Sequence, residues 1–222
     1  MTPRTINSEA RSTRRPGRPA NASSPLARDK LLDVALLRFS EHGVGATTLR
    51  DVATAAGFTP AMVSYYFGDR DALLDAVVAE RLLPVLARLH APLADKNRPL
   101  SALLQSFVEA LFDTVSLHPW LPQLWVREIL TESGSLRWLL IERIGPTLAK
   151  GMVAKFRAAQ RRGEMRRDID PQLLMLSLVG QTMFMAAALP LWRQVFDNQK
   201  TDLTALRMHV PALLETGWRA QQ

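Results

Sequence analysis

The stretch TTLRDVATAAGFTPAMVSYYFGD, residues 47–69, predicts two short helices joined by a tight turn. Thr48 and Thr59 stand where helix N-caps are expected, and a proline directly after Thr59 suits the first helical position. Gly57 can take the positive φ that such a turn needs. Because the first helix has a small inner face of valine and alanine, the second can pack closely across it. The stretch therefore predicts a helix-turn-helix over residues 48–67.

Helical patterns continue on both sides of this motif. Upstream, Ser24 and Pro25 start a helix whose apolar residues recur at helical spacing until Gly43 stops it. Downstream, Asp69 caps a longer helix that runs to about residue 89. Further helices are expected over 99–118, 121–132, 135–162 with a kink at Gly145-Pro146, 171–195, and from Thr201 to 219 with a bend at Pro211. No convincing strand or repeat occurs, so an all-α fold of eight or nine helices is expected.

The positive charge of the chain is concentrated at its N-terminus. The net charge is +7, and residues 1–23 hold five arginines and one glutamate, which gives +4. Basic tails of this kind commonly contact nucleic acid, although a merely solvated tail has the same composition. The chain has no cysteine, which excludes disulfides and thiolate metal sites. The arginine-rich start lacks the apolar core of a secretory signal, so a cytoplasmic protein is expected.

One uncharged segment is long enough to cross a bilayer. It covers residues 171–192, PQLLMLSLVGQTMFMAAALPLW. Its two glutamines, its serine and threonine, and Pro190 near its end favour a helix buried by protein instead. A helix that is apolar on several sides needs partners around it, and a second subunit is a natural source.

The stretch LLDVALLRFSEHGVGATTLRDVATAAGFTPAMVSYYFGDRDALLDAVV resembles the DNA-binding domain of TetR-family transcriptional repressors. The matching features are F-x-E-x-G, then T-T-x-R-D-V-A-x-x-A-G, then Tyr-Tyr-Phe at the end of the second motif helix, over about residues 27–78. The resemblance implies an all-α protein with an N-terminal three-helix DNA-binding domain and a C-terminal helical ligand-binding and dimerisation domain. The expected parts are a disordered basic arm (1–23), the helix-turn-helix domain (24–78) and an effector-binding and dimerisation domain (79–222).

The resemblance also implies roles for single residues at the DNA. Thr48 and Thr59 lie at helix N-termini that can hold phosphates, and Arg50 can reach a guanine or a phosphate. Of the aromatic pair, Tyr65 is expected to face the phosphates while Tyr66 packs inward. Arg70 matches the usual lysine that clamps a phosphate. The DNA-binding candidates are Arg14, Arg15, Arg18, Thr48, Arg50, Thr59, Pro60, Ala61, Ser64, Tyr65, Tyr66 and Arg70.

Two departures from the family pattern remove phosphate contacts. Gly68 stands where many members have lysine, and Ser64 where many have tyrosine. The basic arm can supply the missing attraction, because RRPGRP resembles the core of an AT-hook, a peptide that lies in narrow A·T-rich minor grooves. Pro16 interrupts the usual Arg-Gly pair. Contact with the minor groove or flanking phosphates and a solvated linker both remain open.

Nothing in the sequence indicates an enzyme. The four histidines are scattered without metal-ligand spacing, and Glu109 and Asp113 at i,i+4 are better explained as a solvated face. No glycine-rich phosphate loop occurs. We therefore expect no catalytic residue, no metal and no cofactor.

The C-terminal region concentrates aromatic and sulfur-containing side chains, which either fill the core or line an effector pocket. The loop HPWLPQLW, residues 118–125, is the favoured position for irregular space between helices. Arg127, Glu128 and Arg137 either give that pocket polar specificity or face water. The ligand-binding candidates are Phe107, Trp120, Trp125, Trp138, Met152, Met183 and Phe184.

Together these features predict a transcriptional regulator, a repressor that binds a near-palindromic double-stranded DNA operator as a homodimer and responds to an unknown small-molecule effector. The last two helices would form the dimer as a four-helix bundle. The alternative is an architectural protein that binds A·T-rich DNA without an effector. A protein that has lost DNA binding is a further alternative, suggested by Gly68 and Ser64.

Overall fold

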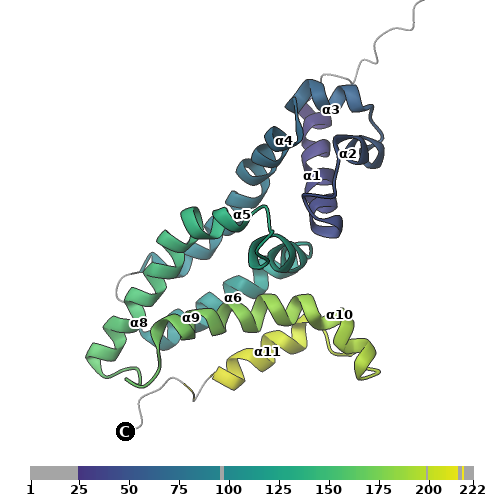
Figure 1. Cartoon of the computed structure of the whole chain (residues 1–222). Coiled ribbons are helices and arrows are strands. Elements are labelled where there is room, and N and C mark those ends of the chain that lie inside the picture. Colours follow the sequence, from purple (N-terminus) through teal and green to yellow (C-terminus); the bar gives the residue numbers. More distant parts are fainter. Residues whose placement is uncertain (1–24, 96–97, 199, 215–216, 218–222) are drawn as a thin grey trace, which may run out of the picture.

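The computed structural model describes residues 25–95, 98–198, 200–214 and 217, and all secondary-structure elements of these residues are helical (Figure 1). This confirms the expected fold class. Three helices form an N-terminal region, and a long helical rod leads from it into a larger helical region. The basic arm, which includes Arg14, Arg15 and Arg18, and the cap residue Ser24 lie outside the described residues.

The N-terminal region consists of α1 (Pro25–His42), α2 (Leu49–Ala56) and α3 (Pro60–Phe67). The predicted helix boundaries are confirmed, because Thr48 and Thr59 cap α2 and α3 through their side chains. Apolar side chains from the three helices meet in a common core that includes Leu32, Phe39, Val52, Ala53 and Val63. Local capping and this shared core explain why two eight-residue helices are stable here.

A continuous helical rod follows. It consists of α4 (Arg70–Val77), η1 (Val78–Leu82), α5 (Leu83–Ala87) and η2 (Arg88–Leu93). Pro84 lies inside the rod, where a proline ring lacks an N–H and crowds the carbonyl four residues earlier. The wide π-helical turn η1 directly before it relieves that crowding. The expected domain boundary at residue 78 therefore falls inside a helix and not in a loop.

Ion pairs attach α1 to this rod. Arg28 donates to both carboxylate oxygens of Glu80 at 2.6 Å, and this charge-assisted hydrogen bond lowers the pKa of Glu80. Arg81 donates to Asp33 at 2.6 Å and to Asp29 at 2.9 Å. The N-terminal region is thus tied to the start of the rod along one side of α1.

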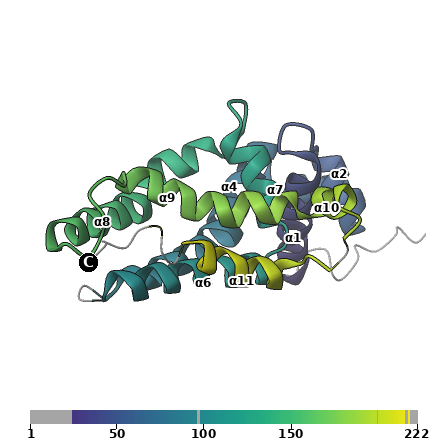
Figure 2. The same ribbon diagram turned by 90° about the horizontal axis from the view of Figure 1, so that it is seen from below.

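The C-terminal region contains α6 (Leu100–Leu117), α7 (Leu121–Leu124) with η3 (Trp125–Leu130), η4 (Leu139–Ala149) with α8 (Lys150–Arg162), α9 (Pro171–Val179) with η5 (Gly180–Phe184) and α10 (Met185–Val195), and α11 (Leu203–Leu214). The helix expected to begin near residue 135 begins later, because the backbone N–H of Leu136 donates to the carbonyl of Glu128 in a tight loop. As Figure 2 shows, α9 and α10 form one long helix, and α11 packs against α6 and α10.

The helix containing Gly145-Pro146 widens at the expected kink instead of breaking. Residues Leu139–Ala149 form an eleven-residue π-helical stretch that accommodates Pro146. A Cβ atom at position 145 would lie 2.7 Å from the carbonyl oxygen of Leu140, so glycine is required for this close approach. The widened stretch forms one wall of the cavity described below.

Two helices among the described residues are long and apolar enough to cross a membrane by length and composition alone, Leu100–Leu117 and Pro171–Val195. In the fold both helices pack against other helices through buried apolar side chains. Leu103, Phe107, Leu111 and Phe112 of α6 are buried in the core, and Leu178 and Met183 of the second helix join them. The outer face of the second helix carries a stripe of exposed apolar side chains, which is taken up under the proposed function.

Candidate nucleic-acid interface and ligand cavity

The outer face of α3 is formed by side chains of its first turn and by Ser64 and Tyr65. Thr59, Pro60 and Ala61 are exposed, whereas Val63 and Phe67 are buried against the other helices. The Thr59 hydroxyl accepts from Met62 N at 3.4 Å. The structure thus brings five of the predicted DNA-binding residues onto one protruding surface.

The aromatic pair of α3 has the expected orientation. Tyr65 is 67% exposed, while Tyr66 is partly buried against the core. The two rings meet edge to face with centroids 5.4 Å apart. This contact supports one edge of the exposed Tyr65 ring.

Thr48 and Asp51 form a reciprocal capping box at the start of α2. The Thr48 hydroxyl donates to Asp51 Oδ2 at 2.6 Å and accepts from Asp51 N at 3.2 Å, while Thr48 N donates to the same carboxylate at 2.9 Å. These hydrogen bonds from Thr48 lower the pKa of Asp51. Much of the hydroxyl's capacity is therefore used inside the cap, which makes Thr48 first of all a positioning residue for α2.

The two arginines of the predicted interface lie in different surroundings. Arg50 is exposed on α2, beside a small polar hollow. Arg70, at the start of α4, donates to the carbonyl oxygen of Gly45 at 3.3 Å and lies 3.7 Å from the Asp71 carboxylate. Arg70 thus connects the α1–α2 loop to α4, and its guanidinium remains partly exposed at the edge of the helix-turn-helix.

A buried carboxylate joins the N-terminal region to the C-terminal one. Glu128, in η3, is 5% exposed. Its Oε1 accepts from the backbone N–H of Val44 at 2.9 Å, and its Oε2 accepts from the backbone N–H of Ser135 at 3.0 Å. One side chain therefore holds the loop after α1 and the loop after η3 at the same time.

Gly43 allows this contact to form. Its φ is +89°, and a Cβ atom there would lie 2.9 Å from Glu128 Oε1 and 3.3 Å from Arg127 Cδ. Arg127 itself donates to the carbonyl oxygen of Glu41 at 2.8 Å, near the end of α1. The expectation that Glu128 serves a pocket or faces water is therefore wrong, because it is buried and holds the loop after α1. Arg127 is exposed to water, as one of the two alternatives had it, while it also holds the end of α1.

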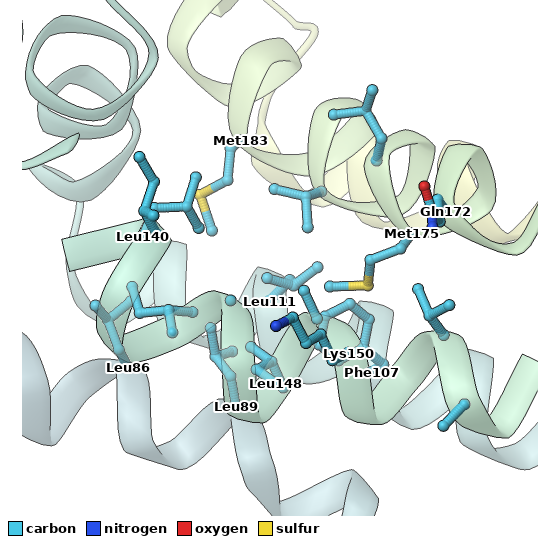
Figure 3. A pocket seen from close by; sticks show the side chains of 18 of the residues that line it. Leu86, Leu89, Phe107, Leu111, Leu140, Leu148, Lys150, Gln172, Met175 and Met183 are labelled. Atoms are coloured by element: carbon cyan, nitrogen blue, oxygen red, sulfur yellow. The ribbon is translucent and has the colours of Figure 1, made fainter. Parts of the chain in front are cut away.

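An apolar cavity of about 670 Å³ lies between the rod and the C-terminal region (Figure 3). Its walls come from α5, η2, α6, η3, η4, α8, α9 and η5. This volume is within the usual range for small-molecule sites, roughly 300–1,000 Å³. Apolar wall residues include Leu86, Leu89, Phe107, Leu111, Leu148 and Met175.

Three of the seven predicted ligand residues line this cavity, namely Phe107, Trp125 and Met183. The other four lie outside it. Met152 is fully buried in the core, and Trp120 packs against His118 at a ring distance of 5.5 Å. Trp138 and Phe184 face outward, 38% and 58% exposed. Sequence gives the apolar character of such positions, but which face of each helix meets the cavity depends on tertiary packing.

Sequence reasoning missed the polar residues of the cavity, Lys150, Arg157 and Gln172. Lys150 and Arg157 are seven residues apart on one helix, a spacing that places them on the same helix face. This spacing was the feature of the sequence from which their proximity could have been predicted. No group of three or more His, Asp or Glu side chains that could hold a metal ion occurs among the residues that the structure describes.

Comparison with known proteins gives matches that centre on the N-terminal region. Residues 31–77 match the family model described as bacterial regulatory proteins, tetR family. Over 104 residues the chain is 35% identical to the HTH-type transcriptional regulator BetI of Burkholderia thailandensis, a match that spans 46% of this chain and about half, 52%, of that relative. Over 194 residues it is 25% identical to BetI of Cronobacter sakazakii, covering 82% and 94% of the two chains.

The fold also matches solved structures over nearly its whole length. The ketosteroid transcriptional regulator KstR2 of Mycobacterium tuberculosis superposes with a TM-score of 0.69 over 90% of this chain and 98% of that one, at 20% identity. At this identity the likeness shows the shared fold, including the C-terminal helices that the family model leaves unmatched.

Proposed function

We propose that this chain, whose residues 31–77 match the tetR family of bacterial regulatory proteins, is a ligand-responsive repressor of that family that binds a near-palindromic DNA operator as a cytoplasmic homodimer. It is a regulator and not an enzyme. The observation that carries the proposal is the pair of hydrogen bonds that Glu128 accepts from Val44 N and Ser135 N, called the Glu128 bridge below. This bridge connects η3, which lines the cavity through Trp125, to the helix-turn-helix domain.

DNA contact is proposed for the protruding face of α3. Its exposed N-terminal turn presents backbone N–H groups and the positive end of a helix dipole, which suit phosphate, while Ser64 and Tyr65 extend the same face. Arg50 and Arg70 flank it from α2 and α4. The arm residues Arg14, Arg15 and Arg18 are proposed to add minor-groove or phosphate contacts, a role that rests on the sequence alone.

Dimerisation is proposed through the outer stripe of α9 and α10. Leu173, Leu176, Phe184, Leu191 and Val195 recur at helical spacing and are 56–65% exposed. On α11, Met208 and Leu213 are exposed as well. An apolar stripe of this length on a free surface marks an association site, and a second copy of the same two helices would bury it in a four-helix bundle. Such a dimer sets two α3 helices about 34–36 Å, or a multiple of it, apart.

The effector is proposed to act through η3. Trp125 lines the cavity, and Glu128 lies three residues further along the same short element. A ligand that displaces Trp125 would move the carboxylate that holds Val44, and with it the end of α1. A change in the orientation of the two helix-turn-helix domains would alter the distance between the two α3 helices. They would then no longer match the two half-sites of the operator, and DNA would be released.

The test measures fluorescence anisotropy of the full-length protein with duplexes tiled across the DNA that flanks its coding region, and with scrambled duplexes, at two salt concentrations. We expect at least one duplex to bind about 10³-fold or more tightly than its scrambled version. Equal affinities for all duplexes would contradict the proposal and favour an architectural DNA-binding protein.

Deletion of residues 1–23 separates the arm from the helix-turn-helix. We expect weaker binding and a salt dependence that is shallower by ~0.9 log units per log unit of salt for each lost phosphate contact. Equally weak binding with and without the arm would instead favour a chain that has lost DNA binding.

A further inference from the structure

The cavity changes in chemical character along its length. α8 and α9 pack against each other and are joined by residues 163–170, so the end of α8 lies beside the start of α9. Arg157 and Gln172 line the cavity at this end. Leu140 and Met183 lie together at the opposite end, with Gln172 far from both (Figure 3). The cavity thus has one polar end, and along the rest of its length Lys150 is the polar residue among otherwise apolar described walls.

Both charged residues of the lining are cations. Lys150 and Arg157 are separated by seven residues, two helical turns or about 10 Å along one face of α8. Within the part of the chain that the structure describes, no aspartate or glutamate lines the cavity. Among the described residues neither cation has an ion-pair or hydrogen-bond partner for its side chain, whereas Arg162 at the end of the same helix donates to Glu164 at 2.6 Å. Both cations are exposed to solvent, so they lie at the rim of the cavity, and no described acidic side chain pairs with them there.

This charge arrangement selects among ligand classes. An anionic head near Arg157 and Gln172 gains a charge-assisted interaction and a hydrogen bond at the rim. Lys150, two helical turns earlier on α8, adds a second positive charge along the same wall. A cation would meet two like charges without a carboxylate to balance them. A wholly apolar ligand would fill the leucine-lined part but leave the polar end unmatched.

We propose that the cavity binds an elongated amphiphile with an apolar body and an anionic head, a carboxylate or a phosphate ester. The head lies at Arg157 and Gln172, and the body extends past Lys150 between Phe107, Leu111 and Met175 towards Leu140 and Met183. The claim that this ligand is the effector rests on the proposed function. The claim that the ligand binds in the cavity does not depend on it.

The experiment compares four probes that share one alkyl chain: dodecanoate, dodecyl phosphate, dodecanol and dodecyltrimethylammonium. Binding to the full-length protein without DNA is measured by titration calorimetry below the micelle concentrations, with tryptophan fluorescence as a second signal because Trp125 lines the cavity. We expect both anions to bind about tenfold or more tightly than dodecanol, and the ammonium probe most weakly.

Two variants test where the head group of the ligand binds. Arg157→Gln should weaken dodecanoate binding about three- to tenfold and Lys150→Gln by a smaller factor, and both should leave dodecanol binding unchanged. Arg161→Gln is the matched control, because it removes one positive charge from the same helix but lies outside the cavity.

Three results would overturn the proposal: equal binding of dodecanol and dodecanoate, no binding of either anion, or tightest binding of the ammonium probe. Loss of dodecanoate affinity in Arg161→Gln as large as in the two cavity variants would also overturn it. Since these titrations contain no DNA, their failure leaves the operator test untouched, and failure of the operator test leaves them valid.

Discussion

Glu128 Oε1 lies 2.9 Å from the backbone nitrogen of Val44, a hydrogen bond between residues 84 positions apart in the sequence. It joins a π-helical turn beside the apolar cavity to the loop that positions the helix-turn-helix. Since the other oxygen of the same carboxylate holds Ser135 N, the side chain has no freedom to follow one loop without affecting the other. In the function proposed above, this bridge is the physical connection between the cavity and the DNA-binding region.

Replacement of Glu128 tests the bridge directly. In Glu128→Gln one of the two backbone N–H donors would face an amide NH₂ in a buried position. We expect a loss of about 1–3 kcal/mol in the free energy of unfolding, measured by urea denaturation. The control is Glu132→Gln, an exposed carboxylate two positions beyond the end of η3. Equal stability of the two variants would contradict a structural role for the bridge.

Gly43 is predicted to be intolerant of any side chain. Gly43→Ala places a Cβ in left-handed backbone and 2.9 Å from Glu128 Oε1, so we expect a destabilisation of about 1–2 kcal/mol from the backbone alone. Gly45→Ala is the matched control, because a Cβ there meets nothing within 4 Å. Thermal unfolding of both variants distinguishes the two positions. If Gly43→Ala unfolds at the wild-type temperature, the close approach is not present in solution.

The exposed stripe of α9 and α10 predicts the oligomeric state. Leu191, 61% exposed in the single chain, would be buried at the proposed interface. Leu191→Lys should shift the dimer to monomer in sedimentation velocity and weaken operator binding, since two half-sites are no longer held together. Leu37→Lys, at an exposed apolar position on α1, should leave the dimer intact. Sedimentation of Leu191→Lys as a wild-type dimer would rule out this interface.

His118 predicts a loss of stability at mildly acidic pH. Burial, with a smaller contribution from the positive charge of Arg88, lowers the pKa of His118 below its usual 6.5. The unfolded chain therefore binds the proton at a higher pH than the folded one, so stability is complete above about pH 6.5 and falls as the pH drops through the folded-state pKa. Urea denaturation between pH 7.5 and 5 should show a smaller fall in His118→Gln than in wild type. Parallel curves would refute this assignment.

Local chemistry made the N-terminal region predictable. The caps Thr48, Thr59 and Asp69 and the positive-φ residue Gly57 act within a few residues of themselves, so sequence alone gave the boundaries of α2 and α3. The opposite orientations of Tyr65 and Tyr66 followed from helical periodicity combined with the family pattern.

The cavity and the bridge depend on packing between distant segments. Met152 and Phe184 are residue types that often line ligand pockets, but Met152 is buried in the core and Phe184 faces outward. The role of Glu128 requires Val44 and Ser135 to meet it in space, which no local pattern indicates. The same holds for Lys150 and Arg157, whose shared face is evident from spacing while the cavity beside it is not.

The central claim is that occupation of the cavity and binding of the operator are coupled. The most direct test is the operator affinity of the full-length protein with and without saturating dodecanoate, together with its dodecanoate affinity with and without operator. We predict that each ligand weakens the other by the same factor, about 5- to 150-fold, and that Glu128→Gln reduces this factor. Dodecanoate that fills the cavity while the operator affinity stays unchanged would contradict the claim.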